Sequence, residues 1–464
     1  MSVRPPGGWL GWSAAFAALL LIAFVPATGL LTLALVFALA LGSRWLPAED
    51  RGWLVRMAVA GWALRVLFGM VFYAAVVAQG MPDVLGPDGQ AYTHRGWYLA
   101  NLARGGSAFQ VPNLREQSFQ GHLEMVRYYR ETWPDWHEYQ LGAFTVLMGA
   151  SYVLFGYDPI LFRAINAACG VLTALLGFLV AKSLAGSQAG RMTMLFLTWL
   201  PSLFVFSTTN LRDAASIGMG MALLWSLVRF AATRRPVYLL VTAAAIASGN
   251  ALREFYSAIL LAVTMFALFV AWPARLRHKV VYAAAALWML ALLPQARPAV
   301  IRLQRTARLE ILNPTRLFSS HVGYVNSPGV NYRILPDVAY KALTEITLTP
   351  RQWAAAMARG VLHVLFEPAL TVRGLRAALM GALTGVTGFA LALAVCAAVW
   401  LWRGGVPAQV APLLGYLGVF LALLAISEGN AGTVFRHRDI LMPAVAPLAA
   451  AGWIHLRRLR GEQP

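Results

Sequence analysis

The sequence predicts an all-α polytopic membrane protein with about twelve transmembrane helices. Of its 464 residues 59% are hydrophobic and only 12% are charged, about half the charged fraction of a soluble domain. Mean hydropathy is +0.62. Apolar stretches recur along the whole chain, and the expected spans are 9–25, 28–42, 53–79, 159–181, 191–209, 211–230, 236–250, 254–272, 279–294, 376–402, 406–426 and 440–456.

The strongly basic composition, a formal charge of +19, fits this class of protein. Lys and Arg accumulate in the cytoplasmic loops of membrane proteins, next to anionic lipid headgroups. The chain has neither zinc-finger spacing nor an RNA-binding signature, so no nucleic-acid partner is expected. Cys169 and Cys396 lie in apolar runs and predict no disulfide framework.

Short basic loops set the expected topology. They alternate correctly only if the apolar stretch 141–155 does not cross the membrane, and that stretch is then a juxtamembrane or re-entrant helix on the outer side. Both termini are then cytoplasmic, and two long hydrophilic segments, about 80–140 and 295–375, face the periplasm or exterior. The loops used are those with Arg44 and Arg51, Lys182 and Arg191, Arg234 and Arg235, Arg275 to Lys279, Arg403, and Arg457 to Arg460.

In this topology the unusual polar residues gather at the outer face. Ionisable residues at helix ends near one surface indicate a functional site. Each residue alone would also fit an interfacial anchor or a snorkelling side chain. The residues concerned are Asp83, Asp88, Arg163, Asn210 to Asp213, Arg253, Glu254 and the segment from Glu428 to Asp439.

The first motif is Gly86-Pro87-Asp88-Gly89-Gln90-Ala91-Tyr92, directly after the 53–79 span. Pro and Gly on either side of Asp88 predict a turn rather than a helix. A short helix is expected at 99–103, ending at Arg104-Gly105-Gly106. A carboxylate at the membrane surface can act as a general base. An Asp in a Pro-Gly turn is also a common structural feature.

Three further motifs follow. In the first, Arg163 lies seven residues after Leu154-Phe155-Gly156, where it can pair with a phosphate or snorkel to the interface. In the second, Asp213 follows the segment from Pro201 to Arg212, where it can cap a helix or carry function. In the third, Arg436, His437 and Arg438 follow Gly429 and Gly432 and form a candidate phosphate cradle, or else a solvated loop on the other side.

This order of motifs resembles the GT-C membrane glycosyltransferases, in particular the lipid A aminoarabinose transferases and the protein O-mannosyltransferases. The resemblance covers roughly residues 53–270. It assigns Asp88 to the family's first-loop acid, with Tyr92 as its companion aromatic residue. It assigns Arg163 to the essential Arg of the next span, Asp213 to the second-loop acid, and Arg253 to a position that is Lys in the aminoarabinose enzymes. The 141–155 stretch matches a family segment that lies along the membrane.

The chain departs from the family pattern at two places. Gly89 stands where a second acid usually follows the first. Trp136-His137-Glu138-Tyr139 replaces the Lys/His-Pro-Pro start of the juxtamembrane helix. These departures leave open whether a divalent metal is needed, and which lipid, glycan or protein accepts the sugar.

The resemblance implies a GT-C-like catalytic core over 1–294, with its first outer loop at about 80–158, then an outer loop at 295–375 and C-terminal transmembrane helices at 376–464. It implies transfer of a sugar from a polyprenyl-phosphate-linked donor to an acceptor hydroxyl at the outer face of the plasma membrane, with inversion. Asp88 would be the base, and Asp213 would orient the surroundings of Asp88 or contact the acceptor. The donor phosphate would be held by Arg163, Arg253, Arg436, His437 and Arg438, supported by Tyr92, Asp83, Arg212 and Glu254.

Two other functions compete with this interpretation. A polysaccharide polymerase or O-antigen ligase works from the same face but relies on Arg and His rather than on a first-loop Asp. A lipid-linked-sugar flippase or other transporter would also need cations inside the membrane. Transporters typically show paired halves with interrupted helices in corresponding positions, and the sequence shows no such pairing.

Overall fold

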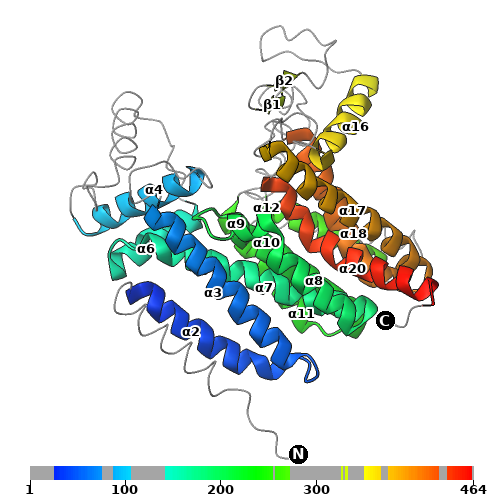
Figure 1. The fold of residues 1–464 in the computed structure, drawn as a ribbon, viewed down its shortest axis with the longest axis horizontal. Helices are drawn as coiled ribbons and strands as arrows, with labels where there is room; N and C mark the ends of the chain where they lie inside the picture. Colours follow the sequence, from blue (N-terminus) through cyan, green and yellow to red (C-terminus); the bar gives the residue numbers. More distant parts are fainter. Residues whose placement is uncertain are drawn as a thin grey trace, which may run out of the picture. The chain divides into compact units, whose positions relative to one another are not determined.

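The computed structural model describes residues 26–75, 87–105, 142–253, 256–271, 325–327, 330–332, 350–366, 375–427 and 436–461. These residues are almost entirely helical, which confirms the all-α class (Figure 1). Within the described ranges, strands occur only in one short antiparallel pair, β1 (Val325–Ser327) and β2 (Val330–Tyr332).

Seven of the described helices are long and apolar enough to cross a membrane, which confirms a multi-pass membrane protein. Each coincides with an expected span, because hydropathy and length are the properties from which those spans were predicted. The seven are α2 (Pro26–Gly42), α3 (Arg51–Ala75), α7 (Pro159–Ala185), α10 (Asp213–Thr233), α17 (Leu375–Arg403), α18 (Pro407–Ser427) and α20 (Met442–Leu459).

The other expected spans have different outcomes. The continuous span expected at 191–209 is wrong, because the chain breaks at Leu200 into α8 (Ser187–Trp199) and α9 (Pro201–Phe206). Pro201 lacks an amide hydrogen and so cannot continue the ladder of α8. The expected spans at 236–250 and 254–272 are helices of 16 residues each, α11 (Val237–Leu252) and α12 (Tyr256–Ala271). The expected spans 9–25 and 279–294 lie outside the described residues.

The chain forms two compact units that interleave along the sequence. The first contains the described parts of 1–179, 191–222 and 245–257. The second contains 180–190, 223–244 and the described parts of 258–464. Five of the described helices contribute residues to both units: α7, α8, α10, α11 and α12.

In the first unit, two helices lie across one end of the bundle: α4 (Pro87–Ala103) and α6 (Ala143–Phe155) (Figure 1). Edge-to-face ring pairs join them, with Trp97 and Tyr152 centroids 6.1 Å apart and Tyr92 and Phe144 centroids 5.8 Å apart. Ala27 from the start of α2 packs into the same cluster. At 13 residues α6 is about 20 Å long, short of the ~30 Å hydrocarbon core.

The start of α4 corrects one prediction from the sequence. Asp88 does not lie on a turn, because the helix begins at Pro87 and runs without a break to Ala103. Proline is well suited to the first helical position, where its missing amide hydrogen has no partner to lose. The helix expected at 99–103 is therefore the last turn of a longer one. Its end is as expected, with Gly105 in the left-handed region at φ +69°.

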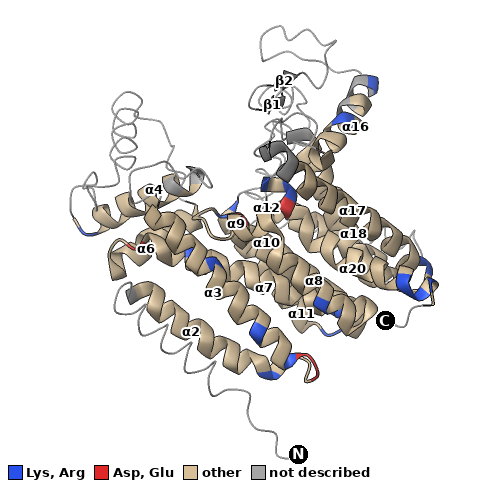
Figure 2. Ribbon diagram, in the orientation of Figure 1, with Lys and Arg blue, Asp and Glu red and all other residues tan. Residues whose placement is uncertain are grey.

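The opposite end of the first unit carries basic residues. Arg191 pairs with the buried carboxylate of Asp50 at 2.8 Å, and Arg44, Arg51 and Arg56 lie on the neighbouring part of the chain (Figure 2). This is the end that the charge rule assigns to the cytoplasm. The orientation itself stays a prediction.

The second unit is built around α17 and α20, which pack along each other, and around α16 (Pro350–Phe366), which packs on α18. Small side chains line the buried faces of α17 and α20, and they let the two backbones approach closely, as is usual between membrane helices. Examples are Ala394, Ala397, Ala444 and Ala451, each fully buried. Near the C-terminal ends of α17 and α20, Trp400 stacks on His455 with ring centroids 4.1 Å apart.

Candidate functional site

Residues 207–212, between α9 and α10, form a buried loop in the first unit, which we call the junction loop. The loop ends at Asp213, the first residue of α10. Side chains from α7 bind its backbone, a side chain from α3 binds the hydroxyl of Ser207, and α4 packs against it. Each contact involves residues far apart in the sequence, so the loop joins several parts of the unit.

The α7 side of the loop is held by Arg163 and Asn166. Arg163 Nη1 donates to the carbonyl of Thr208 at 3.0 Å. Asn166 Nδ2 donates to the carbonyls of Thr209 and Leu211, both at 2.7 Å. Arg163 is 3% exposed, and its guanidinium lies 5.8 Å from the centre of the Tyr73 ring. The described contacts of Arg163 thus fix the backbone of the loop, in addition to any role toward a ligand.

Arg65 on α3 was missed by the sequence reasoning, and it holds the loop from the membrane interior. Its Nε donates to Ser207 Oγ at 2.8 Å, and its Nη2 donates to the carbonyl of Thr198 at 2.7 Å. Pro201 cannot donate to the carbonyl of Leu197, and Arg65 Nη2 also lies 3.5 Å from that oxygen. An Arg in the middle of an apolar span, together with a Pro inside another, was the available signal.

The first turn of α4 packs directly on the junction loop. Gly89 is buried, and a Cβ atom at this position would lie 3.0 Å from the carbonyl carbon of Asn210 and 3.2 Å from the amide nitrogen of Leu211. Gly89 thus replaces the second acid of the family pattern at a position where the backbone of the loop leaves little room for a side chain. Asp88 is the preceding residue of α4; its side chain and the whole of Asp83 lie outside the described part of the structure.

Asp213 and Arg253 form a buried ion pair at the end of the junction loop. Their side chains are 6% and 11% exposed. Asp213 is the first residue of α10, where a carboxylate favours the helix N-terminus, and it also binds a cation. Arg253 follows α11 directly, and Glu254 lies outside the described residues.

The neighbouring Arg212 connects the loop to α4 and α11. Its guanidinium lies 5.5 Å from the centre of the Tyr92 ring, and its Nη1 donates to the carbonyl of Leu252 at 3.1 Å. The structure therefore brings five of the predicted site residues together around one loop: Tyr92, Arg163, Arg212, Asp213 and Arg253. Among the residues described, no three His, Cys, Asp or Glu side chains gather as metal ligands.

Asp158 is a second residue that sequence reasoning missed. Its Oδ1 accepts the amide hydrogens of Ile160 and Leu161, both at 3.0 Å, and so caps α7. Its Oδ2 accepts the hydroxyl of Thr28 at 3.1 Å, which ties α2 to the start of α7. Burial raises the pKa of Asp158, and these hydrogen bonds partly oppose the shift. An Asp directly before Pro159 is a recognisable helix start signal.

The predicted phosphate cradle near the C-terminus belongs to the second unit. Arg438 is 3% exposed and donates to the carbonyl of Leu365 at 3.1 Å and to Thr384 Oγ1 at 3.3 Å. Arg436 Nη2 lies 3.3 Å from His437 Nε2. Residues 428–435 lie outside the described part, and a common site with Arg163 and Arg253 stays a prediction.

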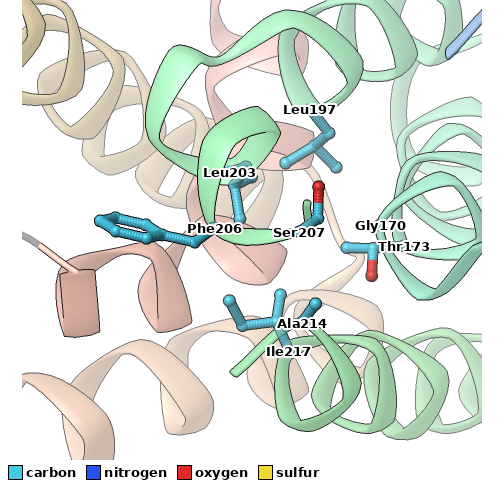
Figure 3. Close-up of a pocket in the computed structure, with 8 residues that line it drawn as sticks. All are labelled: Gly170, Thr173, Leu197, Leu203, Phe206, Ser207, Ala214 and Ile217. Atoms are coloured by element: carbon cyan, nitrogen blue, oxygen red, sulfur yellow. The ribbon is translucent and has the colours of Figure 1, made fainter. Parts of the chain in front are cut away.

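A small pocket lies beneath the junction loop, between α7, α8, α9 and α10 (Figure 3). Its lining is mainly apolar, with Leu197, Leu203, Phe206 and Ile217. The hydroxyl-bearing side chains of Thr173 and Ser207 line it as well. Such a lining suits hydrocarbon better than a charged group.

The fold and the junction loop define a multi-pass membrane protein with a buried polar site at one end of a helical unit. A family model described as dolichyl-phosphate-mannose-protein mannosyltransferase matches residues 143–296, about a third of the chain. The match confirms the resemblance to the GT-C membrane glycosyltransferases and supports a lipid-linked sugar donor. It includes Arg163, Asp213 and Arg253, whereas Asp88 precedes it. No curated protein and no solved structure matches the chain.

Proposed function

We propose that the chain transfers a sugar from a polyprenyl-phosphate-linked donor to a hydroxyl of a lipid, glycan or protein acceptor at the outer face of the membrane. One observation carries the proposal: the first turn of α4, which contains Asp88, packs on the loop that leads into the Asp213–Arg253 pair. This contact lies between the segment that carries the first expected acid and the loop that leads to the second, although 125 positions, from 88 to 213, separate the two acids.

The proposed chemistry is a direct displacement at the anomeric carbon. The acceptor oxygen forms the new glycosidic bond, and the bond from the anomeric carbon to the phosphate oxygen breaks with its electron pair remaining on the polyprenyl phosphate. The hydroxyl proton passes to the Asp88 carboxylate as general base. Attack opposite the leaving phosphate inverts the anomeric configuration.

Fixed cations would stabilise the charge that grows on the phosphate. Arg253 supports this role, because Asp213 holds its guanidinium in place before reaction, so little reorganisation is needed. We assign the same function to Arg163, whereas the expected contribution of Arg436, His437 and Arg438 stays a prediction from the sequence. Tyr92, Arg212, Asp83 and Glu254 complete the proposed site, and the segment 295–375, including α16, would select the acceptor.

Exchange of Asp88 for Asn tests the proposal. The change is nearly isosteric, so membrane insertion should survive while transfer falls by about a hundred- to ten-thousand-fold, as is typical for loss of a general base. Asp83→Asn, five residues earlier, is the matched comparison and should lower transfer far less, because Asp83 is assigned only a supporting role and does not accept the proton. The measurement is release of free polyprenyl phosphate from labelled polyprenyl-phosphate sugars, with cell membranes as the acceptor source.

The two variants separate the competing functions. Full activity in Asp88→Asn with loss in Asp83→Asn would move the base to position 83. Full activity in both variants would refute the proposed mechanism and favour a polymerase or ligase, because these enzymes do not rely on a first-loop carboxylate. Absence of release in the wild type would favour a transporter.

A further inference from the structure

A continuous set of buried hydrogen bonds links α4, α7 and the junction loop. Thr93 Oγ1 donates to the carbonyl of Gly89 at 2.9 Å, one turn earlier in α4. Asn210 Nδ2 donates to Thr93 Oγ1 at 2.8 Å and to the carbonyl of Pro159 at 3.2 Å. Thr93 is 4% exposed and Asn210 is 2% exposed. One amide group therefore bonds to the first residue of α7 and to Thr93 in the second turn of α4, and Thr93 passes the link on to Gly89 in the first turn.

The chemistry of these groups fixes the orientation of the amide. The Thr93 hydroxyl has one hydrogen, which it gives to Gly89, so it can only accept from Asn210. The carbonyl of Pro159 is also only an acceptor. The NH₂ group of Asn210 must therefore face both partners, and a flipped amide would set an oxygen against two oxygens. Correspondingly, no donor in the described part of the chain bonds Asn210 Oδ1.

Contacts from α7 and α4 hold the backbone on both sides of Asn210. Asn166 holds the carbonyls on either side, those of Thr209 and Leu211. Gly89 lies against the backbone of Asn210 itself. Because its backbone is held in this way, the loop cannot shift to compensate for a displaced Asn210 side chain. Such a displacement would therefore move the first turn of α4.

We propose that Asn210, acting through Thr93, is a positioning residue that sets the first turn of α4 against the Asp213–Arg253 pair. It acts on the proposed base through Gly89, the residue next to Asp88, and it has no contact with the reacting atoms. The inference rests on the proposed function. Misplacement of a catalytic group by about 1 Å can lower a rate by about a hundred-fold, so the effect should appear in kcat.

The test uses Thr93, whose hydroxyl can be removed with almost no change in shape. Thr93→Val should lower kcat by about ten- to a hundred-fold and leave the KM for the donor within about twofold. Thr93→Ser keeps the hydroxyl and should restore most of kcat. In an Asp88→Asn background, Thr93→Val should cost nothing further, because the group being positioned is already absent. Rates are measured on the full-length protein in membranes, normalised to the amount inserted.

Each outcome decides the proposal. Unchanged kcat in Thr93→Val, equal losses in the Val and Ser variants, or an additive loss in the Asp88→Asn background would each overturn the positioning role. If Thr93→Val does not accumulate in the membrane, Thr93→Ala carries the same expectations. Full activity of Asp88→Asn alone would refute the proposed function, whereas an active Thr93→Val beside an inactive Asp88→Asn would refute only the positioning role.

Discussion

Substitution of Gly89 by Ala should reduce activity by disturbing a single packing contact. The added methyl group would lie 3.0 Å from the carbonyl carbon of Asn210 and 3.2 Å from two backbone nitrogens, and backbone atoms cannot rotate away as a side chain can. Overpacking of this kind costs about 1–3 kcal/mol. The preference of helices for Ala over Gly returns only about 0.5–1 kcal/mol. The first turn of α4 should therefore move off the loop by a few tenths of an ångström.

Gly52→Ala is the matched control, because Gly52 also lies in the first turn of a helix, α3, and its added methyl group would meet nothing within 4 Å. The measurements are the apparent melting temperature of the purified protein in detergent and the rate of sugar transfer. Gly89→Ala should lower both, whereas Gly52→Ala should lower neither. Equal behaviour of the two variants would show that the contact between α4 and the junction loop does not control the site.

Three further predictions concern the surroundings of the site. Arg65→Met should lower the melting temperature in detergent, because each buried carbonyl left unpaired costs about 1–3 kcal/mol. Arg56 is exposed on the same helix, and Arg56→Met should leave the melting temperature unchanged. Equal shifts in the two variants would contradict the role of Arg65. Because the pKa of Asp158 is raised, the folded protein binds the proton of this carboxyl more tightly than the unfolded chain does. The stability of the wild type relative to Asp158→Asn should therefore fall as the pH rises above 3.8, the ordinary pKa of Asp. A rise in relative stability would contradict the effect of burial. In a background without Cys169 and Cys396, the variant Gly142→Cys should react with an impermeant thiol reagent in intact cells. The variant Gly42→Cys should react only after lysis. The reverse pattern would show that the expected topology is inverted.

Hydropathy was sufficient to predict much of the fold. The long apolar helices coincide with expected spans because burial in lipid requires little more than length and composition. The end of α4 at Gly105 was also predictable, since a Gly in the left-handed region is a common helix stop. The start of the same helix was not, because Pro-Asp-Gly is compatible both with a turn and with a first helical turn.

The contacts that build the site could not be predicted from local patterns. Thr93 and Asn210 are 117 positions apart, and Arg65 and Ser207 are 142 apart. Asn210 was singled out only as part of the polar group Asn210 to Asp213, and Thr93 belongs to no motif with a known chemical role. Their importance follows only from the way that α4, α7 and the junction loop meet. The family order indicated which acids and cations to examine, but not which neutral side chains hold them.

The transfer reaction itself is the central claim, and the fate of a labelled donor tests it most directly. Purified protein in vesicles would receive polyprenyl-phosphate sugars labelled in the sugar, together with an extract of cell-envelope lipids, glycans and proteins. The account predicts that label appears on an acceptor while an equal amount of polyprenyl phosphate is released, and that Asp88→Asn prevents both. Label that crosses the bilayer on an intact donor would instead identify a flippase and contradict the account.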